Sequence, residues 1–160
     1  MLNITIIALG KLKEQYLREA SAEYQKRLSA SCKLNIVELI PEKLSDNPSQ
    51  KEIENALSAE SKKIMEKIPK GAKVYSMCIE GKQRTSEELS RELDSIALEG
   101  VSNIAFIIGS SFGLSEEVKK LTHYRLSMSK MTFPHQIARI MLLEQIYRSL
   151  QISAGTKYHK

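Results

Sequence analysis

Strand-like and helix-like patterns alternate along the whole chain, and this alternation restricts the fold more than any other feature. Short apolar runs rich in β-branched residues predict strands at residues 2–9, 34–40, 73–79, 104–108 and 124–128. Helical periodicity and capping residues predict helices at residues 13–29, 49–67, 85–98, 114–121 and 134–151. Such alternation favours a mostly parallel sheet covered by helices. Because no linker or repeat divides the 160 residues, we expect a single α/β domain.

The last predicted helix, residues 134–151, carries apolar residues on every side, among them Ile137, Met141 and Leu150. A helix that is apolar all round must be covered all round. One face can pack on the sheet, and a second subunit is the preferred cover for another face. The alternative is a fully buried central helix in a monomer. Glu144 and Arg148 are spaced to form an ion pair on this helix.

Positive charge is concentrated at the C-terminal end of the chain. Residues 119–160 contain eight Lys or Arg and one acid, whereas residues 1–118 contain 16 basic and 18 acidic residues. A local excess of this kind favours a polyanionic partner such as nucleic acid, although a basic net charge also serves solubility. His123, His135 and His159 all lie in the same basic segment.

The residues that follow the third, fourth and fifth predicted strands are candidates for one ligand site. These segments are 77–82, 109–113 and 128–133. The carboxyl ends of parallel strands share one edge of the sheet, and ligands bind there. The segments are mostly small, neutral or apolar, which suits an adenine-like cofactor better than a triphosphate with magnesium. Residues 109–113 match neither a P-loop nor a GxGxxG motif, so a plain strand-to-helix turn is an equal alternative.

Polar side chains near the last helix are the candidates for chemistry. His135 opens that helix, and Arg139 follows one turn later. Arg148, Tyr158 and His159 form a further polar set in the basic segment. The alternatives are a helix N-terminal histidine that serves only structure and a frayed, solvated C-terminal tail.

Several other classes of protein are disfavoured by the sequence. No Cys, His and Asp residues have metal-ligand spacing, so we predict no metal. Cys32 and Cys78 lie in or beside apolar runs and are interpreted as buried thiols rather than a disulfide. No apolar run approaches the length of a membrane span, and the N-terminus predicts a strand rather than a signal peptide. We therefore expect a cytoplasmic protein without a membrane partner.

The chain resembles the RlmH-type ribosomal RNA methyltransferases, the pseudouridine-N3 methyltransferases of the SPOUT superfamily. The resemblance covers essentially the whole chain. It is carried mainly by the segment Ser-Met-Ser-Lys-Met-Thr-Phe-Pro-His-Gln at 127–136 and by Tyr-His-Lys at 158–160. Shorter matching pieces lie at 10–13, 22–28, 81–88, 106–109 and 143–148.

This resemblance implies one methyltransferase domain over residues 1–160, with a cofactor-binding and knotted part at about 73–160. It implies a deep C-terminal trefoil knot, a homodimer, and S-adenosylmethionine bound in the knot. The implied substrate is N3 of a pseudouridine in 23S ribosomal RNA, within the large ribosomal subunit or an assembled 70S ribosome. A non-catalytic RNA-binding or ribosome-binding protein, and a Rossmann-like or flavodoxin-like enzyme on a small substrate, stay open as alternatives.

The resemblance also implies roles for individual residues. The implied cofactor contacts are Met77, Gly109, Met128, Ser129, Lys130, Met131, Thr132 and Phe133. The catalytic candidates are His135, Arg139 and His159, with the two histidines as candidates for proton handling. The candidates for RNA contact are Arg148, Tyr158 and Lys160. Two positions depart from the family pattern: Ser110 replaces a usual glycine, and Cys78 replaces a usual acid.

Overall fold

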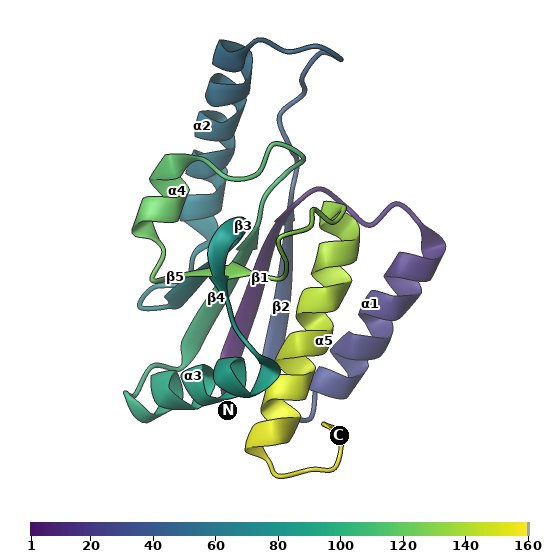
Figure 1. The fold of residues 1–160 in the computed structure, drawn as a ribbon, viewed down its shortest axis with the longest axis vertical. Coiled ribbons are helices and arrows are strands. Elements are labelled where there is room, and N and C mark those ends of the chain that lie inside the picture. Colours follow the sequence, from purple (N-terminus) through teal and green to yellow (C-terminus); the bar gives the residue numbers. More distant parts are fainter. Residues whose placement is uncertain (160) are drawn as a thin grey trace.

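The computed structural model describes residues 1–159, which form a five-stranded sheet with helices on both faces (Figure 1). The strands are β1 (Asn3–Leu9), β2 (Lys33–Leu39), β3 (Lys73–Gln83), β4 (Asn103–Ile108) and β5 (Tyr124–Ser127). The helices are α1 (Gln15–Leu28), α2 (Gln50–Lys67), α3 (Ser86–Leu98), α4 (Glu116–Leu121) and α5 (His135–Ser153). The strand order is β2-β1-β4-β3-β5, and each neighbouring pair is parallel. The predicted parallel α/β fold is confirmed.

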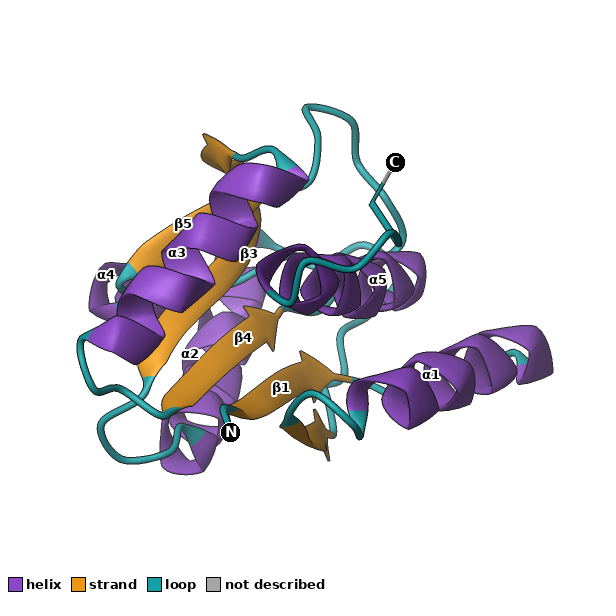
Figure 2. Cartoon of the chain, turned by 90° about the horizontal axis from the view of Figure 1, so that it is seen from below, coloured by secondary structure: helices purple, strands orange, loops and turns teal. Residues whose placement is uncertain are grey.

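The helices are divided between the two faces of the sheet. Helices α1, α3 and α5 pack together on one face, and α2 and α4 cover the other, as Figure 2 shows from below. Alternate residues of β1 enter the two cores: Ile6 packs with the α1, α3 and α5 side, and Ile7 packs with the α2 and α4 side. The central strands are therefore apolar on both faces, as is typical of a parallel sheet.

Two helices begin where their capping residues predict. The Ser49 hydroxyl accepts a hydrogen bond from the backbone N–H of Glu52, and the Glu52 carboxylate accepts one from the backbone N–H of Ser49. Thr85 and Glu88 form the same reciprocal pair at the start of α3. Both are capping boxes, which satisfy N–H groups that a helix cannot pair internally.

The third strand differs from its prediction. The strand was predicted to end at residue 79, but β3 continues to Gln83. Its pairing with β5 shifts between Met77 and Lys82, so residues 78–81 leave the ladder. A Cβ on Gly81 would lie 2.8 Å from the backbone carbon of Arg125, so this glycine permits close approach of two strands. The predicted end of the strand was wrong because a glycine can mark the close approach of two strands as well as the end of one.

Helix α5 is fixed to the sheet by a buried arginine. The Arg139 side chain is 2% exposed, and its Nη1 donates to Glu38 Oε2 of β2 at 2.6 Å. Its Nη2 donates to the backbone oxygen of Gly10 at 2.9 Å. On the outer side of the helix, Ile137 stays 39% exposed, so α5 is not covered all round within one chain. The threading of α5 through a knot stays a prediction.

Candidate functional site

A large cavity lies at the carboxyl edge of the sheet, beyond β3, β4 and β5. Its volume is about 850 Å³. The three segments predicted to form one site do meet around it. Its lining includes Met77, Cys78, Ile79, Glu80, Gly109, Ser110, Phe112, Lys119, Met128, Ser129, Met131, Thr132, Phe133, His135 and Ala138. Of the eight residues implied as cofactor contacts, seven line the cavity; Lys130 is exposed and does not.

The turn after β4 requires a glycine at position 109 because the turn packs against its own backbone. A Cβ at this position would lie 2.4 Å from the backbone oxygen of Gly113, closer than such atoms approach. The Gly113 N–H donates to the backbone oxygen of Ser110 at 2.8 Å and closes the turn. The glycine therefore allows the turn to fold back on itself at the wall of the cavity.

Ser110, which departs from the family pattern, contacts a residue of α2. Its hydroxyl donates to Glu60 Oε1 of α2 at 3.0 Å, and the backbone N–H of Glu42 donates to Glu60 Oε2 at 2.9 Å. Glu60 is only 3% exposed. The serine therefore links the turn after β4 to a buried carboxylate of α2, on the face of the sheet that α2 and α4 cover.

The irregular part of β3 forms an ion pair at the cavity that sequence reasoning missed. Glu80 pairs with Lys119 of α4 at the cavity, and this hydrogen bond lowers the pKa of the Glu80 carboxyl. Burial raises the pKa of the Cys78 thiol, so the half-buried sulfur is held neutral. No local pattern predicts the Glu80–Lys119 pair, because its members are 39 residues apart.

His135 stands at the first turn of α5, where the cavity reaches the centre of the sheet. Burial, and then the positive charges of Arg139 and Lys13, lower the pKa of His135 below its ordinary value of 6.5. None of the described residues 1–159 hydrogen-bonds to its ring nitrogens. The imidazole is therefore neutral at neutral pH, and a nitrogen is available to accept a proton.

Arg139 lies beneath His135, and its guanidinium contacts the protein rather than the cavity. Its catalytic role stays a prediction. This placement favours a part in holding the first turn of α5 against the turn after β1.

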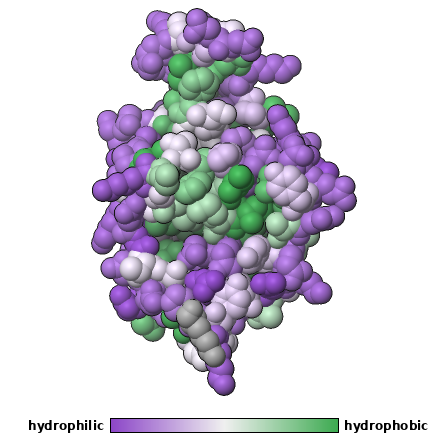
Figure 3. Space-filling view, turned by 45° about the vertical axis from the view of Figure 1, so that its right-hand side comes forward, coloured by the Kyte–Doolittle hydropathy of each residue, from purple (hydrophilic) through white to green (hydrophobic). Residues whose placement is uncertain are grey.

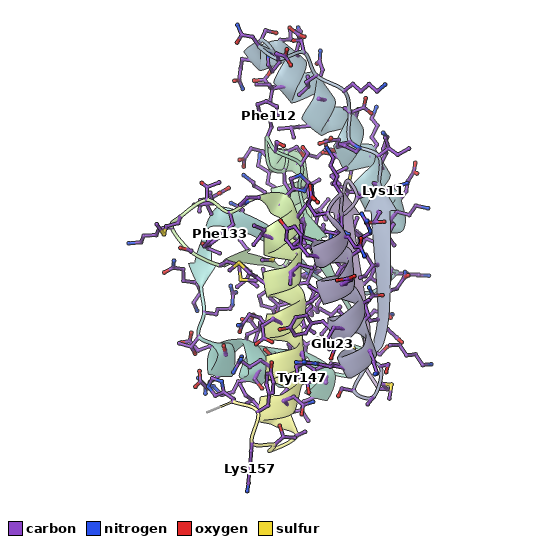
Figure 4. All side chains as sticks on the ribbon, turned by 90° about the vertical axis from the view of Figure 1, so that its right-hand side faces the viewer. Lys11, Glu23, Phe112, Phe133, Tyr147 and Lys157 are labelled. Carbon is purple, nitrogen blue, oxygen red and sulfur yellow. The ribbon has the colours of Figure 1, made fainter. Side chains whose placement is uncertain are left out.

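The residues of the C-terminal tail lie at the other end of α5. This helix has 19 residues, which corresponds to a length of roughly 28 Å. Figure 4 shows Phe112 and Phe133 near the beginning of α5, and Tyr147 and Lys157 toward its end. The structure therefore separates the tail from the large cavity of the same chain.

Within one chain the tail is paired with acidic residues. Arg148 pairs with Glu144 at 2.7 Å, as its spacing predicts, and the Tyr158 hydroxyl donates to Glu144 Oε2 at 2.8 Å. His159 Nε2 lies 2.7 Å from Glu87 Oε1 of α3. Lys160, a candidate for RNA contact, lies outside the described residues.

Two further features of residues 1–159 bear on the sequence predictions. No group of three or more His, Cys, Asp or Glu in this part of the chain is arranged to hold a metal ion. Cys32 is buried with a free thiol, as interpreted from its apolar surroundings.

A membrane-spanning helix would need a long apolar segment, and none of the helices formed by the described residues has one.

The fold and the cavity define a single-sheet α/β protein with a ligand site at the carboxyl edge of parallel strands, the usual position for nucleotide-type cofactors. The family described as "Predicted SPOUT methyltransferase" matches residues 2–159, and the chain belongs to this family. The resemblance found in the sequence is thereby confirmed.

Similar proteins and structures agree with this assignment. The chain is 52% identical to Ribosomal RNA large subunit methyltransferase H of Clostridium beijerinckii, over 99% of this chain and 100% of the relative. The protein of the same name from Clostridium novyi is also 52% identical, with the same coverage. A solved structure of a probable methylase family protein from Haemophilus influenzae matches with a TM-score of 0.55. That match covers 99% of this chain and 70% of the other at 13% identity, and it supports the fold alone.

We expect Gly109→Ala to close the large cavity, because the added methyl would meet the Gly113 carbonyl oxygen and the turn would have to shift. Calorimetry with S-adenosylmethionine, the cofactor that the resemblance implies, should show a loss of affinity of at least about tenfold, or roughly 1.4 kcal/mol. Gly71→Ala is the control for strain away from the cavity: Gly71, unlike Gly109, has a positive φ of +75°, but no atom lies within 4 Å of the added Cβ and the residue precedes β3. Equal affinities in the two variants would contradict this role of the turn.

Proposed function

We propose that this methyltransferase uses S-adenosylmethionine to methylate N3 of a pseudouridine in the RNA of the large ribosomal subunit. One observation carries the proposal: three segments distant in sequence line one cavity that His135 also enters. The relatives named Ribosomal RNA large subunit methyltransferase H support the class of substrate. A ribosomal substrate also supports a location in the cytoplasm.

The large cavity suits S-adenosylmethionine in size and chemistry. Its apolar wall, which includes Met77, Met128 and Phe133, can enclose an adenine ring. In this proposal backbone groups of Met128, Ser129 and residues 131–133 contact the ring edge, and the paired Glu80 and Lys119 offer partners for hydroxyl and carboxylate groups. When bound, this cofactor supplies an electrophilic methyl group. In this proposal the cofactor-binding and knotted part of the domain spans residues 73–160.

His135 is the best-placed base for the acceptor nitrogen. N3 of a pyrimidine carries a proton and is a poor nucleophile, so the N3–H bond must break as the N3–methyl bond forms. The His135 imidazole lines the large cavity, and its lowered pKa keeps it in the form that accepts a proton. Arg139 serves as a positioning residue, because its contacts to Glu38 and Gly10 hold the first turns of α5.

A homodimer through α5 would bring the tail of one chain to the cavity of the other. Ile137 is exposed, and Ile140, Met141, Tyr147 and Leu150 are only half-buried in the single chain. Figure 3 shows an apolar area at the centre of the face that carries this helix, framed by hydrophilic residues. Two copies of α5 that run in opposite directions about a two-fold axis place the end of each helix beside the beginning of its partner. Arg148, Tyr158 and His159 would then serve the partner's site, with Tyr158 able to stack on a base.

The proposed reaction is tested by incubating the protein with S-adenosylmethionine and ribosomes that lack the modification, followed by mass mapping of the RNA. We expect one methyl group on a pseudouridine of the large-subunit RNA. Cofactor binding without methylation of RNA would favour an enzyme that acts on a small substrate. RNA binding without cofactor binding would favour a non-catalytic ribosome-binding protein.

The pH dependence distinguishes the two candidate histidines. Because the pKa of His135 is lowered, its neutral form persists at neutral pH, and the methylation rate should fall only as the pH drops below the ordinary value of 6.5. His135→Gln should reduce the rate by about a hundredfold or more and remove this fall in rate at low pH, the acid limb of the pH profile. His159→Gln should lower the rate but retain the acid limb. Single-turnover rates across the pH range measure both effects, and the reverse pattern would assign the base to His159.

The dimer is tested by Ile137→Glu, which places a carboxylate on the outer face of α5. Because Ile137 is exposed in the single chain, the variant should fold but sediment as a monomer with little activity. Leu98→Glu is the matched control, since Leu98 is 89% exposed on α3 and should leave the dimer intact. Analytical ultracentrifugation measures both variants. Wild-type protein that sediments as a monomer at micromolar concentration would rule out the dimer.

A further inference from the structure

The turn after β4 separates two crevices of the sheet, of which the large cavity occupies one. Strand β4 leads to α4 on one face, whereas its neighbours β1 and β3 lead to α1 and α3 on the other. Adjacent strands whose connections leave to opposite faces open a crevice between them, and ligands bind in such crevices. The large cavity lies on the β3 side of β4. A small cavity of about 280 Å³ lies on the β1 side.

The two cavities have a common wall. Ser110, Ser111, Phe112 and His135 line both of them. A ligand in the small cavity is therefore separated from a ligand in the large cavity by single side chains. His135 in particular can contact a group in either one. This arrangement is suited to two reactants that must meet at one atom.

The small cavity has a chemical character that the large one lacks. Leu44, Ile53 and Leu57 provide apolar walls, and the Phe112 ring is 47% exposed at the shared side. A buried carboxylate, Glu60, also lines it.

Glu60 keeps acceptor capacity for a ligand. The carboxylate accepts from the Ser110 hydroxyl at 3.0 Å and from the Glu42 N–H at 2.9 Å. An ionised carboxylate has about four acceptor positions, so two of these stay available. The small cavity therefore fits a flat, partly apolar ligand that donates a hydrogen bond.

We infer that the small cavity receives the acceptor base and that Glu60 recognises its second N–H group. This inference rests on the proposed function. A pyrimidine joined to its sugar through carbon has N–H groups at both N1 and N3. With N3 beside His135 at the shared wall, N1–H donates to Glu60. A uridine has its sugar on N1 and offers no such donor, so Glu60 makes the site selective for the carbon-linked isomer.

The surroundings of the small cavity agree with an RNA nucleotide. Lys11 and Lys13 line it from the turn after β1, and both are exposed, where phosphates on either side of a flipped nucleotide can reach them. Enzymes that modify a base inside folded RNA or DNA move it out of its stack into a pocket and hold it by stacking and by its polar edge. Phe112 and Glu60 provide these two contacts.

The test compares methylation of ribosomes that carry pseudouridine at the target position with ribosomes that carry uridine there. Glu60→Gln keeps the shape of the side chain but loses the charged acceptor. We expect its rate on pseudouridine ribosomes to fall by about tenfold or more and its rate on uridine ribosomes to change by less than about twofold. The affinity for S-adenosylmethionine should stay within about twofold of wild type. Glu54→Gln, an exposed position on the same helix, is the matched control and should change neither rate.

A second variant separates base recognition from support of the turn. Ser110→Gly removes the hydrogen bond between the turn and Glu60 but leaves the carboxylate in place. It should retain the preference for pseudouridine. Loss of that preference in Ser110→Gly to the same extent as in Glu60→Gln would overturn the inference and leave Glu60 with a structural role.

Two further outcomes would overturn it. An unchanged ratio of the two rates in folded Glu60→Gln would show that Glu60 does not recognise the base. If Glu60→Gln lost as much affinity for S-adenosylmethionine as it lost rate, the small cavity would belong to the cofactor site. Wild-type protein that methylates neither kind of ribosome would instead refute the proposed function, so the two failures are distinguishable.

Discussion

The buried guanidinium of Arg139 joins three parts of the chain that would otherwise be independent. It belongs to α5, its carboxylate partner Glu38 belongs to β2, and its second acceptor is the Gly10 carbonyl after β1. A buried charge is costly unless its partners are well placed, and removal of one partner typically costs about 3–5 kcal/mol. Because the Arg139 side chain is only 2% exposed, α5 can pack on the sheet only where the guanidinium reaches both Glu38 and the Gly10 carbonyl. His135, one turn earlier, is thereby fixed over Gly10, where a Cβ would lie 3.5 Å from His135 Cε1.

The position of β4 explains why both cavities lie beside its turn. As the central strand of the sheet, it has neighbours whose connections both leave to the opposite face, so a crevice opens on each side of it. The turn at 109–113 is the wall between these crevices, and its compactness depends on the close approach of Gly113 to Gly109. A thin wall lets His135 reach both cavities. In the proposed function, the fold itself, rather than any single motif, brings a cofactor and an acceptor together.

Sequence reasoning was most successful where the determinants are local. The alternation of patterns predicts the parallel sheet, and capping boxes at Ser49 and Thr85 fix the start of two helices. The continuous segment 128–133 was expected at the carboxyl edge of the sheet, and five of its six residues line the large cavity there. It failed where pairing is long-range. The outward path of residues 78–81 depends on register with β5, and the link from Glu60 to Ser110 spans 50 residues. The buried pair of Arg139 with Glu38, 101 residues away, leaves no local signal either, and the catalytic role of Arg139 stays a prediction.

The contacts that hold the C-terminal tail in the single chain contribute unequally to its stability. Its residues are held in the single chain by Glu144 and Glu87, and the pair between His159 and Glu87 is largely open to solvent. Such exposed pairs contribute little to stability because water and salt screen them. In the proposed function, an RNA phosphate can therefore replace Glu87 as the partner of His159 at small cost, whereas the less exposed pair of Arg148 and Glu144 is screened less. The aromatic contact between Tyr147 and Tyr158, with ring centroids 4.8 Å apart, is the part of the tail that burial stabilises. Rearrangement of the tail onto a partner subunit must therefore offer Tyr158 another apolar surface, and a nucleobase is one that the proposed reaction provides.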